Sequence, residues 1–171
     1  YFFSGQASIK AETAKENMCE NITQYKFVKE SDMKSDLLQM LANFSHYMKN
    51  DFIENKMRNS VGEKIGCFGG EDTMGSGEAG VRTNADLSMV CAFMVKYGKG
   101  KVALPDGVSW NDIEKIAMES LSYSYSSHKA NKLVCCRDGK YWGSISVADY
   151  TWESSLWAMS VAYSAFFQWD K

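Results

Sequence analysis

Apolar residues recur at steps of three and four along two stretches in the first third of this 171-residue chain. Such steps place side chains on one face of a helix, so residues 7–26 and 33–58 are each predicted to be amphipathic helices. The short link between them predicts an antiparallel pair. The expected inward positions are Ala11, Ala14, Met18, Ile22 and Tyr25 in the first helix and Leu37, Leu41, Phe44, Met48 and Phe52 in the second.

Three further helices are predicted in the second half of the chain. One begins near Asn84 and is ended by Gly98 and Gly100, since glycine is common just past a helix end. Ser109 is predicted to cap the next helix. The last begins near Asp149 and is apolar on nearly all sides, which is typical of a helix buried on both sides. We expect part of its cover to come from outside this sequence or from another copy.

Two non-helical segments interrupt this pattern. Seven glycines fall between Gly62 and Gly80, which predicts a Gly-rich loop over residues 59–82. An Asp138-Gly139 pair lies between two short apolar runs and predicts a β-hairpin over residues 133–146. The predicted fold class is therefore mainly α, with antiparallel helical hairpins and one small β-hairpin in a single helical domain of residues 1–171.

The composition excludes several classes of protein. Hydrophobic residues make up 45% and charged residues 23%, as in folded globular domains. Lys and Arg total 19 against 21 Asp and Glu, so no basic excess favours nucleic acid. No apolar run approaches the roughly 20 residues of a membrane span. The five Cys and two His show no zinc-site spacing, so we expect buried free thiols and neither a metal nor a cofactor.

Aromatic residues make up 13% of the chain, more than a small core needs. The surplus predicts a surface for a partner or for stacked ligands, and exposed apolar helix faces would also suit a homo-oligomer. The alternative is a bulky core with scattered exposed rings. Because the chain begins without Met and ends within an apolar pattern, we expect a piece of a longer polypeptide whose export signal lies outside it.

The first candidate site follows the Gly-rich loop, where Arg82 and Asn84 begin a predicted helix. Free amides at a helix start favour an anionic or hydroxyl-rich ligand. Arg82 could clamp a carboxylate and Asn84 could polarise it. The alternative is that Thr83 and Asp86 simply cap the helix.

The second candidate is His128, which follows Tyr123 and Tyr125 near the end of a predicted helix. Histidine titrates near neutral pH, so it could act as a general base beside a tyrosine acid such as Tyr125. The alternative is that it compensates the helix dipole. We expect the turn before Asn84 and the segment after Tyr125 to lie at the same end of the helix bundle.

The third candidate is an aromatic group around the predicted hairpin and the last helix: Trp142, Tyr150, Trp152 and Glu153. Flat rings beside carboxylates suit sugar binding, and paired carboxylates perform glycoside hydrolysis. Asp149 and Glu153 would share one helix face. The alternative is that these two carboxylates only stabilise the helix start.

Residues 81–86, 127–131 and 152–157 resemble parts of the (α/α) toroid proteins that act on polysaccharides, the exported lyases and glycosidases of Bacteroides-like bacteria. The resemblance implies the N-terminal part of a ring of helical hairpins. It also implies that Asn84 or Arg82 neutralises a uronate, that His128 is the base, and that Tyr125 or Tyr123 is the acid.

Two functions follow from these observations. The first is a secreted or periplasmic carbohydrate-active domain, part of a polysaccharide lyase or glycoside hydrolase that acts on an acidic polysaccharide or oligosaccharide. The second is a non-catalytic module for glycan binding or assembly. An anion- or nucleotide-binding role is disfavoured, because no lysine follows the glycines as in a phosphate loop.

Overall fold

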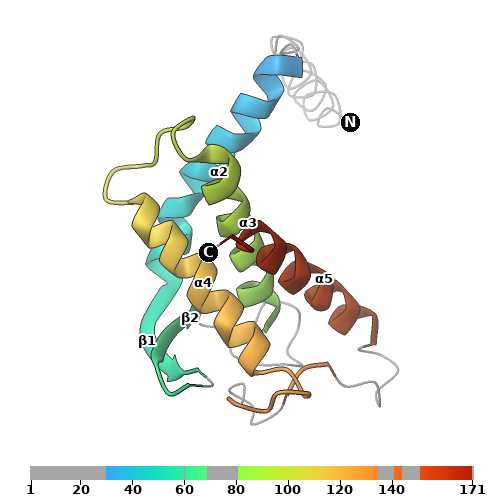
Figure 1. The fold of residues 1–171 in the computed structure, drawn as a ribbon. Helices are drawn as coiled ribbons and strands as arrows, with labels where there is room; N and C mark the ends of the chain where they lie inside the picture. Colours follow the sequence, from blue (N-terminus) through green and yellow to red (C-terminus); the bar gives the residue numbers. More distant parts are fainter. Residues whose placement is uncertain (1–29, 60, 69–80, 135–140, 144–150, 171) are drawn as a thin grey trace, which may run out of the picture. The chain divides into compact units, whose positions relative to one another are not determined.

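The computed structural model describes residues 30–59, 61–68, 81–134, 141–143 and 151–170 (Figure 1). The chain divides into two compact units, residues 1–34 and 35–171. The first unit is described only over residues 30–34, so the account below concerns the second. The helix predicted over 7–26 lies outside the described residues.

The described elements follow one another as four helices and a hairpin between the first two of them. They are α2 (Glu30–Asp51), β1 (Phe52–Arg58), β2 (Lys64–Phe68), α3 (Val81–Gly98), α4 (Trp110–Ser126) and α5 (Thr151–Phe167). The predicted fold class, mainly α with one small β-hairpin, is confirmed. Within the described ranges, no helix combines the length and apolar character that crossing a membrane requires.

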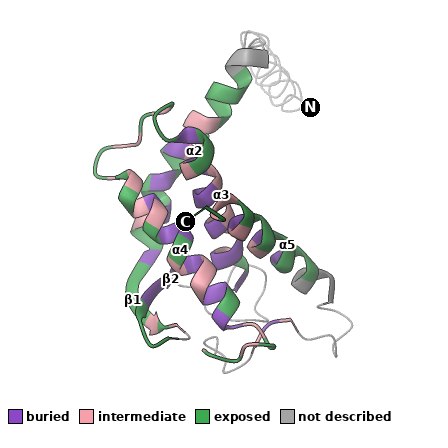
Figure 2. Cartoon of the chain, viewed as in Figure 1, coloured by how far each residue is buried: buried purple, intermediate pink, exposed green. Residues whose placement is uncertain are grey.

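The main core lies where α3 packs against its neighbours (Figures 1 and 2). Burying apolar side chains contributes most of the stability of such a fold. Each element supplies part of this core: Met48 from α2, Phe52 and Phe68 from the hairpin, Cys91 and Met94 from α3, Ile113 and Ile116 from α4, and the partly buried Phe167 from α5. The contacts fix α3 as the central helix, since both α4 and α5 pack on it.

Small polar side chains allow α3, α4 and α5 to approach closely. The hydroxyl of Ser88 on α3 donates to the carbonyl of Ala117 on α4 at 2.6 Å and lies 2.5 Å from the hydroxyl of Ser164 on α5. All three residues are buried. A buried hydroxyl is costly unless it is hydrogen-bonded, so these contacts favour one packing of the three helices.

The helix predicted over residues 33–58 ends at Asp51, and its last seven residues form β1 instead. β1 pairs with β2 in an antiparallel register that matches Phe52 with Phe68. The prediction was wrong here because Phe52 lies four residues after Met48 and both are buried in the main core. Helical spacing alone does not separate the end of a helix from the start of a strand.

The turn between the strands explains why a hairpin forms here. The side-chain oxygen of Asn59 accepts hydrogen bonds from the amides of Val61 and Glu63, at 3.1 and 2.9 Å. Asparagine often organises turns in this way. The Gly-rich loop predicted over 59–82 therefore includes this turn, all of β2 and the start of α3, while residues 69–80 lie outside the description.

The hairpin predicted over residues 133–146 is not seen in the part of that segment that the structure describes. Leu133 and Val134 are in bends, and Trp142 pairs in a parallel bridge with His128 rather than with either of them. Residues 135–140 and 144–146 lie outside the description. Two runs with a turn signal between them predict a hairpin locally, but here one run pairs with the end of a helix.

Polar side chains attach β2 to the helices behind it. The amide of Gly66 donates to the carboxylate of Glu119 on α4 at 2.5 Å. The amide of Phe68 donates to the side-chain oxygen of Asn84 on α3 at 2.9 Å. Buried backbone amides need hydrogen-bond partners, and these two side chains supply them.

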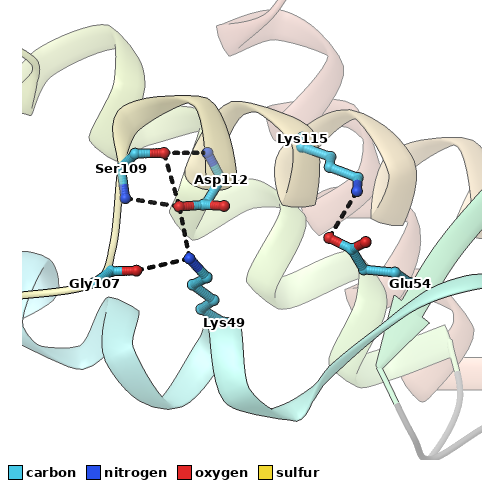
Figure 3. A network of polar contacts seen from close by, with 6 residues as sticks. All are labelled: Lys49, Glu54, Gly107, Ser109, Asp112 and Lys115. Atoms are coloured by element: carbon cyan, nitrogen blue, oxygen red, sulfur yellow. Dashed lines mark hydrogen bonds and ion pairs between the residues drawn. The ribbon is translucent and has the colours of Figure 1, made fainter.

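The start of α4 is capped and tied to α2 (Figure 3). Ser109 and Asp112 form a reciprocal capping box, which confirms the predicted cap at Ser109. Lys49 of α2 binds the Asp112 carboxylate at 3.0 Å and the Gly107 carbonyl at 2.7 Å. Burial raises the pKa of Asp112, but hydrogen bonds from Ser109 and Lys49 and the charge of Lys49 outweigh this effect and lower it overall.

Candidate functional site

The end of α4 and the segment around Trp142 form one connected structure. The amide of Lys129 donates to the Trp142 carbonyl at 2.8 Å, and the amide of Trp142 donates to the Ser127 carbonyl at 3.2 Å. The His128 and Trp142 rings meet edge to face with centroids 4.5 Å apart. The indole N–H of Trp142 donates to the Ser124 carbonyl at 2.7 Å. Hydrogen bonds therefore fix both the backbone and the ring of Trp142.

This structure places the start of α3 and the end of α4 together, as expected from the sequence. Trp142 forms a hydrophobic cluster with Val81, the first residue of α3, and with Trp157 of α5. Trp142 is only 5% exposed. The ring predicted to stack on a sugar instead packs within the protein.

Asn84 and Arg82 lie on the same turn of α3 but in opposite environments. Asn84 is fully buried, and its side-chain oxygen accepts from Phe68 as described above. Arg82 is exposed and lies 4.0 Å from the carboxylate of Asp86. Asp86 also accepts a hydrogen bond from Ser160 of α5 at 2.5 Å. Asn84 thus has a structural role here, whereas Arg82 is accessible to solvent.

The imidazole of His128 is engaged on both sides. Its Nδ1 accepts from the amide of Ala130 at 3.1 Å. Gly143 lies against Nε2 so closely that a Cβ at this position would overlap the ring. Desolvation lowers the pKa of His128, so the neutral ring is favoured. Tyr125 is 55% exposed and reaches solvent near the end of α4.

The other predicted sugar-binding residues are not described. Tyr150 lies outside the described residues, as do the side chains of Trp152 and Glu153. Among the described residues, no group of three His, Cys, Asp or Glu side chains could hold a metal ion. The predicted buried thiols are found at Cys67 and Cys91, and burial raises the pKa of Cys91 to about 12.

A groove of about 370 Å³ lies elsewhere on the molecule, and only apolar side chains line it. It is referred to below as the central groove. Its lining residues come from α2, α3 and α5: Leu41, Met89, Val90, Phe93, Tyr163 and Phe167. Phe93 and Phe167 meet edge to face at 5.6 Å, which fixes the shape of one wall. None of the predicted catalytic or sugar-binding residues lines this groove.

A row of exposed apolar residues on α2 borders this groove; we call it the α2 stripe. Its members are Leu37, Met40, Phe44 and Tyr47, which are 47–63% exposed. Successive residues of a helix are rotated by about 100° around its axis, so these four residues lie beside Leu41, on the flank of α2 that lines the groove. The sequence had placed Leu37 and Phe44 inward, but Ala42, Ser45 and Met48 occupy the buried face. That prediction was wrong because a broad apolar arc is compatible with more than one inward face.

A matching row, the α5 stripe, borders the other side of the groove. It consists of Leu156, Met159, Tyr163 and Phe166, which are 46–61% exposed. Trp157, Ser160 and Ser164 form the buried face of this helix. Tyr163 belongs both to the stripe and to the groove lining. The helix is therefore apolar on two sides, as predicted, but only one of these sides is buried by the described residues.

The α2 stripe, the central groove and the α5 stripe together make up what we call the apolar face. The sequence indicated its aromatic surplus but not its location. Comparison of the chain with protein-family models, with curated proteins and with solved structures finds no match.

Proposed function

We propose that this domain is a non-catalytic assembly module that binds helical protein surfaces through its apolar face. One observation carries this proposal: two exposed apolar rows with the same 3-4-3 spacing flank a groove without polar lining. Monomeric soluble proteins rarely expose contiguous apolar patches larger than a few hundred Å². A patch of this kind marks a surface that is covered in the functional state.

The spacing of the stripes favours a helical partner. Steps of three and four are the repeat with which helices interlock side chains along a seam. A groove between two such rows accepts an amphipathic helix by the common helix-in-groove mode. Burying a half-exposed large apolar or aromatic side chain contributes about 1 kcal/mol, so the eight stripe residues supply a strong driving force.

The candidate catalytic and sugar-binding residues offer less support for an enzyme. Asn84 and Trp142 are buried and hydrogen-bonded within the fold, and His128 is half-buried, with Nδ1 hydrogen-bonded to Ala130 and Nε2 close to Gly143. General acid–base catalysis requires a group within hydrogen-bond reach of its substrate. Only Arg82 and Tyr125 among the described candidates are exposed.

The assembly function is tested with a synthetic amphipathic peptide that carries leucines at 3-4 spacing. We expect it to shift the NMR amide signals of Met89 and Val90 in the central groove. The variant Tyr163→Glu should lose these shifts, because a carboxylate would be buried against apolar groups. Ala158→Glu, on the opposite flank of the same helix, serves as the matched control and should keep them.

Two outcomes would contradict the assembly function. One is an absence of shifts at any peptide concentration, and the other is equal shifts in Tyr163→Glu and Ala158→Glu. Peptide binding should also survive His128→Ala and Tyr125→Phe, since neither residue belongs to the apolar face.

The carbohydrate function remains the second candidate, favoured by the meeting of the α3 start and the α4 end. Incubation of the chain with a panel of polyuronates would generate unsaturated uronide absorbance if a lyase is present. Turnover that His128→Ala abolishes, without loss of folding, would favour the enzyme over the assembly module.

A further inference from the structure

We propose that the partner on the apolar face is a second copy of this chain, related by a twofold axis. This inference rests on the assembly function proposed above and names its partner. Three features of the face carry it: its area, the lack of charged residues in its two stripes and the equal spacing of these stripes.

The exposed area matches what a stable dimer needs. The eight stripe residues are 46–63% exposed. At roughly 200 Å² for a large side chain, they expose on the order of 800 Å² of surface. Stable interfaces of standard size bury about 800 Å² per partner. One such face on each of two copies therefore suffices without further contacts.

The lack of charge suits a contact between identical faces. In a twofold contact the same patch is used by both subunits, so a charged patch would meet its own like charge. Residues 37–48 and 154–169 contain no Asp, Glu, Lys or Arg. The charged residues of α2 lie outside this stretch, at positions such as Asp36 and Lys49. The two stripes thus carry no charge that would repel a second copy, and Lys96 of α3 borders the face, with its Nζ 5.3 Å from the centroid of the Phe166 ring.

The polar residues on the exposed surface of α2 lie on a different flank from the α2 stripe. Gln39 and Asn43 hydrogen-bond to each other at 3.0 Å, and Gln39 also donates to the Ala103 carbonyl at 2.9 Å. His46 and Asn50 are in contact at 3.0 Å one turn further along. The exposed surface of α2 is therefore divided lengthwise into a polar flank and an apolar flank, as expected of a helix at an interface.

The equal spacing of the stripes makes the face complementary to itself. The α2 stripe and the α5 stripe both follow steps of three, four and three. When two copies meet about a twofold axis, every contact from one copy to the other is repeated in reverse. Two rows of the same period and length can then interlock along their whole length and cover the groove between them.

Sedimentation of the purified full chain tests this inference. Between about 1 and about 200 μM, we expect a reversible monomer–dimer equilibrium. In a twofold contact each residue occurs twice, once from each copy. Leu37→Glu and Tyr163→Glu would therefore each bury two carboxylates, and each should weaken dimerisation by at least about 100-fold. Asn43→Glu adds the same charge to the polar flank of α2 and Ala158→Glu adds it to the far flank of α5, and both should leave the dimer unchanged. Circular dichroism of all four variants checks that the helices remain folded.

The outcomes separate this inference from the assembly function. A wild-type chain that stays monomeric but binds the amphipathic peptide, with loss in Tyr163→Glu, overturns the second copy and leaves the assembly function standing. A monomer that binds no peptide overturns both. A dimer that Leu37→Glu and Tyr163→Glu weaken no more than their controls forms elsewhere and also overturns the inference.

Discussion

At the scale of single residues, Asn84 links the start of α3 to the backbone of β2. Its side-chain oxygen is the acceptor for the buried amide of Phe68. We expect Asn84→Ala to lower the free energy of unfolding by about 1–3 kcal/mol, because it leaves that amide unsatisfied. Urea denaturation monitored by circular dichroism measures the change.

Arg82→Ala provides the control on the same helical turn. Its ion pair with Asp86 is exposed and long, at 4.0 Å, so the substitution should cost at most about 1 kcal/mol. If the two variants were equally stable, the structural role assigned to Asn84 would be incorrect.

The environments of Asn84 and Trp142 show what the sequence could not decide. A polar residue at a helix start beside glycines has the same sequence pattern whether it faces a ligand or a neighbouring strand. Trp142 likewise lies next to charged and turn residues in sequence but is buried against Val81 and Trp157. Both assignments depend on which distant element packs against the residue, and spacing along one chain does not carry that information.

His128 should make the stability of the protein depend on pH. Its folded pKa lies below the ordinary value of 6.5 because of desolvation, so the unfolded state binds a proton more readily. Protonation would also remove the Nδ1 acceptor that Ala130 uses. Stability from this residue is present above pH 6.5 and is lost as the pH falls from there through the folded pKa.

Urea denaturation at about pH 7.5 and about pH 5.5 tests this dependence. The wild type should lose more stability on acidification than His128→Gln, whose amide does not titrate in this range. An equal loss in both proteins would show that groups other than His128 account for the acid sensitivity.

At the scale of elements, the cap of α4 stabilises both that helix and its contact with α2. Ser109 and Asp112 form the capping box, and Lys49 binds the same carboxylate (Figure 3). We expect Ser109→Ala to destabilise the protein by about 0.5–2 kcal/mol, the usual cost of removing a cap. The midpoint of thermal unfolding should fall accordingly.

Lys115→Ala serves as the comparison on the same helix. Lys115 contacts Glu54 at 2.7 Å, but both side chains are largely exposed, so the substitution should cost less than about 1 kcal/mol (Figure 3). A larger loss for Lys115→Ala than for Ser109→Ala would mean that the hairpin contact, rather than the cap, holds α4 in place.

Helices were predictable from this sequence, whereas the hairpin was not. The starts of α3 and α4 lie within a few residues of the predicted ones, because capping residues and glycines act locally. The hairpin depends on the pairing of Phe52 with Phe68. The prediction assigned the first of these residues to a helix and the second to a loop. Strand pairing is a contact between separate segments, so a helical repeat that runs into it hides the boundary.

At the scale of the whole molecule, the core is built on one side of α2 and α5. α3 occupies the centre, and α4 and the hairpin cover it further, so the apolar flanks of α2 and α5 face outward. A domain of this size could have used polar residues there. Two helices separated by more than 100 positions thus share the same exposed apolar pattern, which is the pattern on which the proposed assembly function rests.

A dimer through that surface should make stability depend on protein concentration. Because binding to the folded state shifts unfolding by mass action, the midpoint of thermal unfolding should rise when the wild-type concentration is raised about tenfold. Leu37→Glu should show a midpoint independent of concentration, and Asn43→Glu should behave like the wild type. A twofold contact also closes on itself, so light scattering should reach the mass of two chains and stop there. Growth into larger oligomers would mean that different patches meet head to tail, which two identical apolar faces do not allow.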